Sequence, residues 1–154
     1  MAMLAATILG LALIAATCLI HYETLRATAD LMPRLRVPAR AGILVVMTGV
    51  FVAHFLEISL YAAAFALMQD AGLGAISGTT EGGAFDYLYL SLTSYTTLGV
   101  GDVVPTGALR VVTSIEALNG FVLIGWSAAF SYPAMERFWQ MHRRRAKRRG
   151  ARAI

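Results

Sequence analysis

The sequence predicts an all-α membrane protein with three transmembrane helices and one short re-entrant helix between the last two. Three observations predict this fold. Hydrophobic residues make up 58% of the 154 residues and charged residues only 14%, whereas charged residues make up about a quarter of a soluble domain. Three apolar runs reach the length of about 20 residues that a bilayer crossing needs. A polar, glycine-rich stretch interrupts the chain between the second and third runs.

The first run, residues 1–21, is nearly free of charge and is predicted to be an N-terminal transmembrane helix. A cleaved signal peptide is the alternative, but no Lys or Arg precedes the apolar part, whereas secretory signals open with positive charge. Residues 22–40 contain four arginines and two prolines. We expect them to form a cytoplasmic connector, either plain or with a short amphipathic surface helix over residues 23–31.

The stretch at residues 94–102 is polar yet lies between two apolar segments. Irregular backbone at membrane depth survives only where protein surrounds it or where it lines a water-filled cavity. Gly99 and Gly101, one residue apart, permit backbone conformations with positive φ. Successive carbonyls can then turn toward one axis, which is what replacing the water shell of a bare cation requires. The residues therefore predict a loop that can bind cations through main-chain oxygens.

Seven consecutive residues resemble the selectivity-filter signature T-T-[VI]-G-[YFL]-G-D of the tetrameric potassium-channel superfamily: Thr96-Thr97-Leu98-Gly99-Val100-Gly101-Asp102. The similarity covers about residues 85–132, and it is to small bacterial-type two-helix pore-loop channels, here with an extra N-terminal transmembrane helix. The sequence departs from the pattern at Val100, where an aromatic or bulky residue usually braces the filter. A weakly selective Na⁺/K⁺ channel is therefore the alternative to a potassium-selective one.

The resemblance implies a pore domain at residues 41–135 and a role for each residue of the loop. Its parts would be an outer helix at 41–68, a pore helix at 84–97, the selectivity-filter loop at 97–102 and an inner helix at 107–135. The filter would consist of Thr97, Leu98, Gly99, Val100 and Gly101, with K⁺ bound by the carbonyls of the first four, Asp102 at the outer mouth, and Tyr89, Thr93 and Thr96 as filter support. One loop cannot enclose an ion, so a homotetramer is implied. No catalytic residue and no cofactor besides permeant K⁺ is expected.

The predicted pore helix is too short to cross a membrane. About 14 residues can enter a bilayer but cannot cross it, and Asp102 and Pro105 follow the glycines too closely for a continuous crossing. The partial negative charge at the C-terminal end of such a helix favours a cation. Residues 70–83, rich in glycine and threonine, are expected to form an exposed loop before it.

The second apolar run carries His54 and Glu57, which are three residues apart and therefore share a helical face. Ionisable groups in a bilayer are costly unless they are paired or face the protein interior. We expect an intramembrane polar contact with Glu116 on the last helix. Metal binding by His54 and Glu57 is the weaker interpretation, because the chain offers no second pair of this kind and only three histidines.

Gly120 lies near the middle of the last apolar run. In related channels a glycine at this position lets the inner helix bend, so Gly120 is a candidate hinge. Close packing of helices through small residues is an equally good reason for a glycine there. The neighbouring Asn119 would face the cavity or bind a neighbouring helix.

Twelve of the thirteen Lys and Arg residues lie in the 22–40 connector or in the basic tail at 136–154. The positive-inside rule places both segments in the cytoplasm and the N-terminus outside. The resemblance implies that the membrane is the inner membrane of a bacterium. The tail would contact anionic lipids, and no nucleic-acid role is expected.

Two further classes of function are considered. Gly99-Val100-Gly101-Asp102 also fits the Gly-x-Gly-Asp pattern of intramembrane aspartyl proteases, whose chemistry needs a second aspartate close by. No other aspartate is expected within a spanning helix, so we do not expect an enzyme. A non-conducting accessory membrane protein is the remaining alternative.

Overall fold

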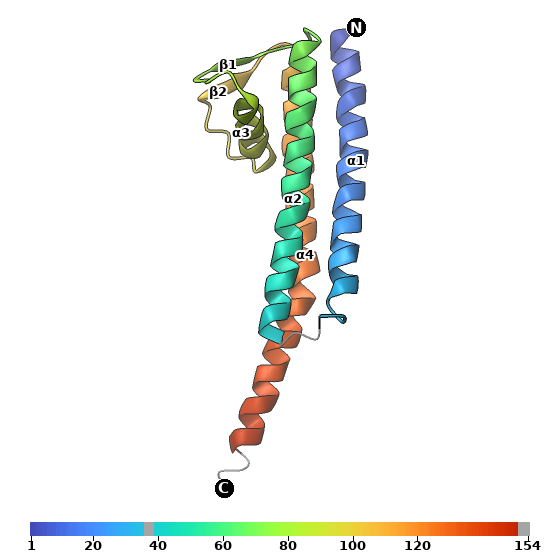
Figure 1. Cartoon of the computed structure of the whole chain (residues 1–154), viewed down its shortest axis with the longest axis vertical. Helices are drawn as coiled ribbons and strands as arrows, with labels where there is room; N and C mark the ends of the chain where they lie inside the picture. Colours follow the sequence, from blue (N-terminus) through green and yellow to red (C-terminus); the bar gives the residue numbers. More distant parts are fainter. Residues whose placement is uncertain (36–38, 151–154) are drawn as a thin grey trace.

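The computed structural model is a bundle of three long helices with a short helix and a two-stranded ribbon at one end (Figure 1). It describes residues 1–35 and 39–150, and the side chains of residues 1–35 and 41–136. The elements in chain order are α1 (Ala2–Leu31), α2 (Ala39–Asp70), β1 (Ile76–Gly78), α3 (Ala84–Tyr95), β2 (Val103–Pro105) and α4 (Leu109–Gly150). The predicted fold class is confirmed: α1, α2 and α4 are long and apolar enough to cross a membrane.

The three long helices form because each apolar run can satisfy its backbone hydrogen bonds only within itself when water is absent. α1 packs against both α2 and α4, and α3 lies against α2 and α4. The N-terminus lies at the same end of the bundle as α3 and the ribbon, and the last turns of α4 lie at the opposite end (Figure 1). α3 has only 12 residues and enters the bundle from this end without crossing it.

Two helices are longer than the sequence indicated. α1 continues ten residues past the predicted end at residue 21, because no helix breaker occurs before Pro33. Leu25 and Thr28, one turn apart, are buried, so this part of α1 is packed and is not a connector. α4 runs past the predicted end at residue 135 to Gly150, with Pro133 inside the helix. The connector residues 36–38 and the tail residues 151–154 lie outside the described residues.

The expected loop at residues 70–83 contains β1, which pairs antiparallel with β2. Ile76 lies opposite Pro105 and Gly78 opposite Val103. The ribbon has no sequence signal of its own, since three residues form a strand only when a partner lies beside them. It ties the segment before α3 to the segment after the glycine-rich loop, and so holds the end of that loop that leads into β2.

Residues from all three long helices share one hydrophobic core. Tyr61, Phe65 and Met68 of α2 pack with Leu109 and Val112 of α4. α1 contributes Ala6 and Leu13 to the same cluster. The added N-terminal helix is therefore part of the main core and not a separate anchor.

Candidate functional site

The loop after α3, residues 97–102 (hereafter the glycine loop), has an alternating backbone. Thr97, Gly99 and Gly101 have φ of +58°, +54° and +87°, while Leu98 and Val100 between them do not have positive φ. Departures of this kind from regular backbone can turn successive carbonyls to one side of the chain, and carbonyls gathered in this way can replace the water around a cation. The two glycines adopt this backbone without the steric cost that a Cβ atom adds.

The inner end of the glycine loop is bonded to the last turn of α3. The N–H of Thr97 donates to the carbonyl of Ser94 at 2.9 Å, and the N–H of Gly99 donates to the carbonyl of Thr93 at 3.1 Å. The Thr96 hydroxyl donates to the carbonyl of Leu92 at 2.7 Å. Two of the three predicted support residues, Thr93 and Thr96, thus contact the loop or the helix end through main-chain and hydroxyl groups.

The outer end of the glycine loop is held by Asp102. The Tyr89 hydroxyl donates to its two carboxylate oxygens at 2.9 and 3.1 Å, and this hydrogen bond raises the pKa of Tyr89. The N–H of Val103 donates to the same carboxylate at 3.0 Å, and the N–H of Thr79 donates to the Asp102 carbonyl at 2.9 Å. The third predicted support residue, Tyr89, therefore joins α3 to the residue predicted at the outer mouth.

Asp86 fixes the start of α3. Its carboxylate accepts the N–H groups of Gly82 at 2.8 Å, Gly83 at 3.2 Å and Glu81 at 3.3 Å. Burial acts to raise the pKa of Asp86, but these three backbone hydrogen bonds outweigh it and lower the pKa. A carboxylate in the first turn also interacts favourably with the helix dipole.

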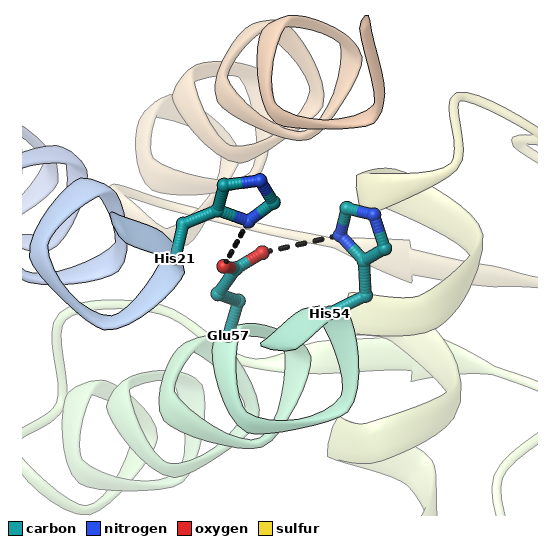
Figure 2. A group of neighbouring side chains, drawn as sticks. All are labelled: His21, His54 and Glu57. Atoms are coloured by element: carbon teal, nitrogen blue, oxygen red, sulfur yellow. Dashed lines mark hydrogen bonds and ion pairs between the residues drawn. The ribbon is translucent and has the colours of Figure 1, made fainter. Parts of the chain in front are cut away.

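A second group of polar side chains lies inside the bundle, and Figure 2 shows its centre. The Glu57 carboxylate lies between two imidazole rings. His21 Nδ1 of α1 lies 2.8 Å from one carboxylate oxygen, and His54 Nδ1 of α2 lies 3.2 Å from the other. The Tyr95 hydroxyl, at the end of α3, donates to Glu57 and lies 2.8 Å from His54 Nδ1. The group thus joins α1, α2 and α3.

Ser127 of α4 completes this group. Its hydroxyl oxygen lies 3.3 Å from His21 Nε2 and 3.0 Å from His54 Nε2. The two imidazole centroids are 5.3 Å apart, and Trp126 lies 5.2 Å from the His21 ring. We call His21, His54, Glu57, Tyr95 and Ser127 the histidine cluster. It brings together one or two side chains from each of the four helices.

The predicted contact between Glu116 and the His54–Glu57 pair is wrong. Glu116 instead accepts a hydrogen bond from the Ser91 hydroxyl of α3, and its second oxygen has no partner within the described part of the chain. The reason is that Glu57 and Glu116 lie at different depths along the helix bundle. Glu57 precedes the end of α2 by 13 residues and Glu116 follows the start of α4 by 7. The difference of 6 residues corresponds to about 9 Å along a helix.

Sequence reasoning missed three members of the histidine cluster: His21, Tyr95 and Ser127. One signal was available, because His54 and Glu57 share a face within a spanning helix and need a polar partner. His21 is one of three histidines in the chain, but a helix that ends at residue 21 would place it at the membrane surface. The extension of α1 to Leu31 brings His21 into the bundle, where it is fully buried.

The middle of α4 makes a second polar contact with α1. The Asn119 amide donates to Thr17 of α1 at 2.7 Å and lies 3.2 Å from the Tyr61 hydroxyl of α2. Asn119 is buried. Of the two expectations for this residue, the structure supports the contact with neighbouring helices.

Gly120 is a site of close helix packing. A Cβ atom added there would lie 2.8 Å from Cγ of Tyr95 and 2.9 Å from its carbonyl carbon, and closer still to its carbonyl oxygen. The absence of a side chain therefore lets α4 approach the last residue of α3. Packing explains this glycine in the bundle, and its role as a hinge stays a prediction.

The fold and the glycine loop define a class of membrane protein, a pore domain of two long helices with a re-entrant helix and loop between them. Residues 42–136, more than half of the chain, match a protein-family model described as an ion channel. The chain belongs to this ion-channel family, which confirms the resemblance found in the sequence. The family points to transport and not to enzyme catalysis.

The family match begins near the start of α2, so α1 and His21 lie outside it. Comparison with curated proteins and with solved structures gives no match. This extra helix packs against both helices of the family-matched region, α2 and α4.

Proposed function

We propose that this protein conducts cations, with K⁺ as the preferred ion, through the glycine loops of a homotetramer. The observation that carries the proposal is the alternation of positive φ at Thr97, Gly99 and Gly101. A loop of this conformation can present the carbonyls of Thr97, Leu98, Gly99 and Val100 as a row of oxygen ligands. Carbonyl rings of this kind replace the hydration shell of K⁺ in selectivity filters.

Four copies are proposed because one loop presents its oxygens from one side only. A cation that has lost its water needs oxygen ligands all around it, and cyclic symmetry supplies them from identical loops. The bonds at both ends of the loop support the same function. Tyr89 with Asp102 at the outer end and Thr93 with Gly99 at the inner end limit how far the carbonyls can move.

The charge distribution supports an orientation in the membrane. We place the N-terminus and the glycine loop outside the cell and the basic tail in the cytoplasm, in the inner membrane of a bacterium, because Lys and Arg favour the cytoplasmic side. Glu81, Asp86 and Asp102 near the outer end of the loop would concentrate cations there. The tail at 136–154 would bind anionic lipids.

The reversal potential under opposed K⁺ and Na⁺ gradients tests the proposal, measured with the purified chain in planar bilayers. We expect a reversal potential close to that of K⁺ and a tetramer in mass measurements of the detergent-solubilised protein. Gly99→Ala, at φ +54°, should abolish K⁺ flux, while Gly125→Ala on an open face of α4 should conserve it. Wild-type flux through Gly99→Ala, or a particle that stays monomeric, would contradict the proposal.

A weakly selective Na⁺/K⁺ channel is the second candidate, and Val100 is the observation that favours it. The Val100 side chain is 57% exposed and carries no hydroxyl, so it braces the loop less than an aromatic residue would. If this candidate is correct, Val100→Tyr should raise the K⁺ over Na⁺ permeability ratio. A permeability ratio that already favours K⁺ in the wild type and does not change in Val100→Tyr would exclude this second candidate and support the potassium-selective channel.

A further inference from the structure

We propose that His21, His54 and Glu57 bind one divalent transition-metal ion of the Zn²⁺ class between α1 and the pore domain. One donor atom from each residue lies within 4.8 Å of the other two. Two imidazoles and one carboxylate are a recurring protein ligand set for Zn²⁺, with the fourth position left to another group. The proposal does not depend on conduction by the glycine loop.

The ligand atoms are already close to the spacing that an ion needs. His21 Nδ1 and His54 Nδ1 lie 2.8 and 3.2 Å from the two oxygens of Glu57. Ligands about 2.0–2.1 Å from a tetrahedral zinc are about 3.3 Å apart. Figure 2 shows both rings turned toward the carboxylate that lies between them. An ion can therefore replace the hydrogens on the two Nδ1 atoms with small movements of side chains.

The hydrogen bonds within the cluster depend on which tautomer each neutral histidine adopts. If both rings donate to Glu57 through Nδ1–H, both Nε2 atoms become acceptors. Both face the Ser127 hydroxyl, at 3.3 and 3.0 Å. That hydroxyl has a single hydrogen, so with these tautomers one Nε2 atom is left without a donor. The other tautomer of His54 satisfies both rings, because its Nε2–H can donate to Ser127 while its Nδ1 accepts from the Tyr95 hydroxyl 2.8 Å away.

An ion bound by the two Nδ1 atoms also satisfies the hydrogen bonding of both rings. Each ring then carries its hydrogen on Nε2, and the two lone pairs of the Ser127 oxygen can accept both N–H groups. Such an acceptor on the far ring nitrogen fixes the tautomer and orientation of a metal-binding histidine. One extra proton on either ring, or the neutral His54 tautomer that accepts from Tyr95, also satisfies both rings, so these are the competing states.

The charge of the cluster fits a cation at this place. The side chains of His21 and Glu57 are fully buried, and among the described side chains no Lys or Arg is bonded to Glu57. A carboxylate inside a membrane protein is costly unless it is paired, and a divalent ion would pair it. His54, Tyr95 and Ser127 also line one side of a largely apolar cavity of about 870 Å³.

The position of the site indicates what the ion would hold together. His21 comes from α1, outside the family-matched residues 42–136. Tyr95 donates to Glu57 and is the last residue of α3, two positions before the glycine loop begins. An ion bound here would fasten the added helix to the base of the loop.

Metal binding by the purified full-length chain tests the proposal. After removal of metals with a chelator, Zn²⁺ is titrated by calorimetry in detergent at pH 7.5, and Co²⁺ is added separately to record its ligand-field absorption. We expect one ion per chain. His21→Gln and Glu57→Gln should each weaken binding more than tenfold and remove the Co²⁺ absorption band. Ser127→Ala should weaken binding by about 10–100-fold, as other losses of an outer-shell partner do.

His142→Ala is the matched control, because it removes the remaining histidine of the chain and leaves the cluster intact. It should bind Zn²⁺ as the wild type does. Size-exclusion profiles and thermal unfolding in the absence of metal report whether each variant is folded. The glutamine variants are used because they keep a polar side chain of similar size.

Two outcomes would overturn the proposal. One is a wild-type chain that binds no Zn²⁺ or Co²⁺, including the case in which its stability follows pH through the histidine range, which would assign the cluster to a proton. The other is binding that survives His21→Gln and Glu57→Gln but disappears in His142→Ala. Because binding is measured in detergent without ion flux, neither result bears on the proposed channel function.

Discussion

Replacement of Gly120 by alanine separates helix packing from hinge bending, and Gly125 on the same helix is its control. Both glycines lie within α4. A Cβ atom at Gly120 would lie 2.8 Å from Cγ of Tyr95, whereas a Cβ atom at Gly125 would meet nothing within 4 Å. The two substitutions therefore add the same methyl group to the same helix in different surroundings.

The expected magnitudes follow from two opposing effects. Alanine in place of glycine stabilises a helix interior by about 1 kcal/mol. An extra carbon forced into a packed contact costs about 1–3 kcal/mol. Gly125→Ala should then raise the free energy of unfolding by about 1 kcal/mol. Gly120→Ala should lie about 1–3 kcal/mol below it, because Tyr95 must move.

Unfolding of both variants in detergent, by heat and by denaturant, measures this difference. K⁺ flux in liposomes should fall in Gly120→Ala, since displacement of the Tyr95 backbone disturbs the residues directly before the glycine loop. If Gly120→Ala is stabilised as much as Gly125→Ala, the packing argument is refuted. Reduced channel opening without a loss of stability would then identify Gly120 as a hinge.

Three further predictions concern hydrogen bonds around the loop and the bundle. Tyr89→Phe removes the bond to Asp102 and should make single-channel currents less stable, while Tyr87→Phe, which removes a hydroxyl of the same helix, should not. Asn119→Ala deprives two buried hydroxyls of a donor and should lower the free energy of unfolding by about 1–3 kcal/mol, measured in the same unfolding assay. Because the pKa of Asp86 is lowered, its stabilising effect is present above the ordinary aspartate pKa and is lost as pH falls through the lowered value; the difference in melting temperature between wild type and Asp86→Asn should close over that range.

Much of the fold could be predicted because its determinants are local. The apolar run of α2 was predicted at 41–68 and is found at Ala39–Asp70, since only helix satisfies the backbone of such a run in a membrane. The ends of α1 and α4 were missed because they depend on tertiary packing of Leu25 and Thr28 and on the tolerance of Pro133 within a helix. The ribbon was missed because β1 has a partner 25 or more residues away.

The candidate sites divide in the same way. The irregular backbone of the glycine loop could be predicted from Gly99 and Gly101, because glycine accepts positive φ in any fold. The partners of Glu57 could not, because they depend on the depth and rotation of four helices. Because Glu57 and Glu116 differ in depth by about 9 Å along the helix axis, Glu116 binds Ser91 and Glu57 binds His21.

The sequence by itself determined three membrane-crossing segments, a loop that can turn its carbonyls to one side, and membership of a pore-forming class. The first two properties reside in hydropathy and in the conformational freedom of single residues, which act over one helix or one turn, whereas the class follows from the resemblance of residues 96–102 to potassium channels. Only the tertiary structure decided that α1 reaches into the core and places His21 beside Glu57, His54 and Ser127. His21 is separated from Glu57 by 36 positions in the sequence and from Ser127 by 106. Contacts over such separations arise from how whole helices pack, and packing depends on all their side chains together.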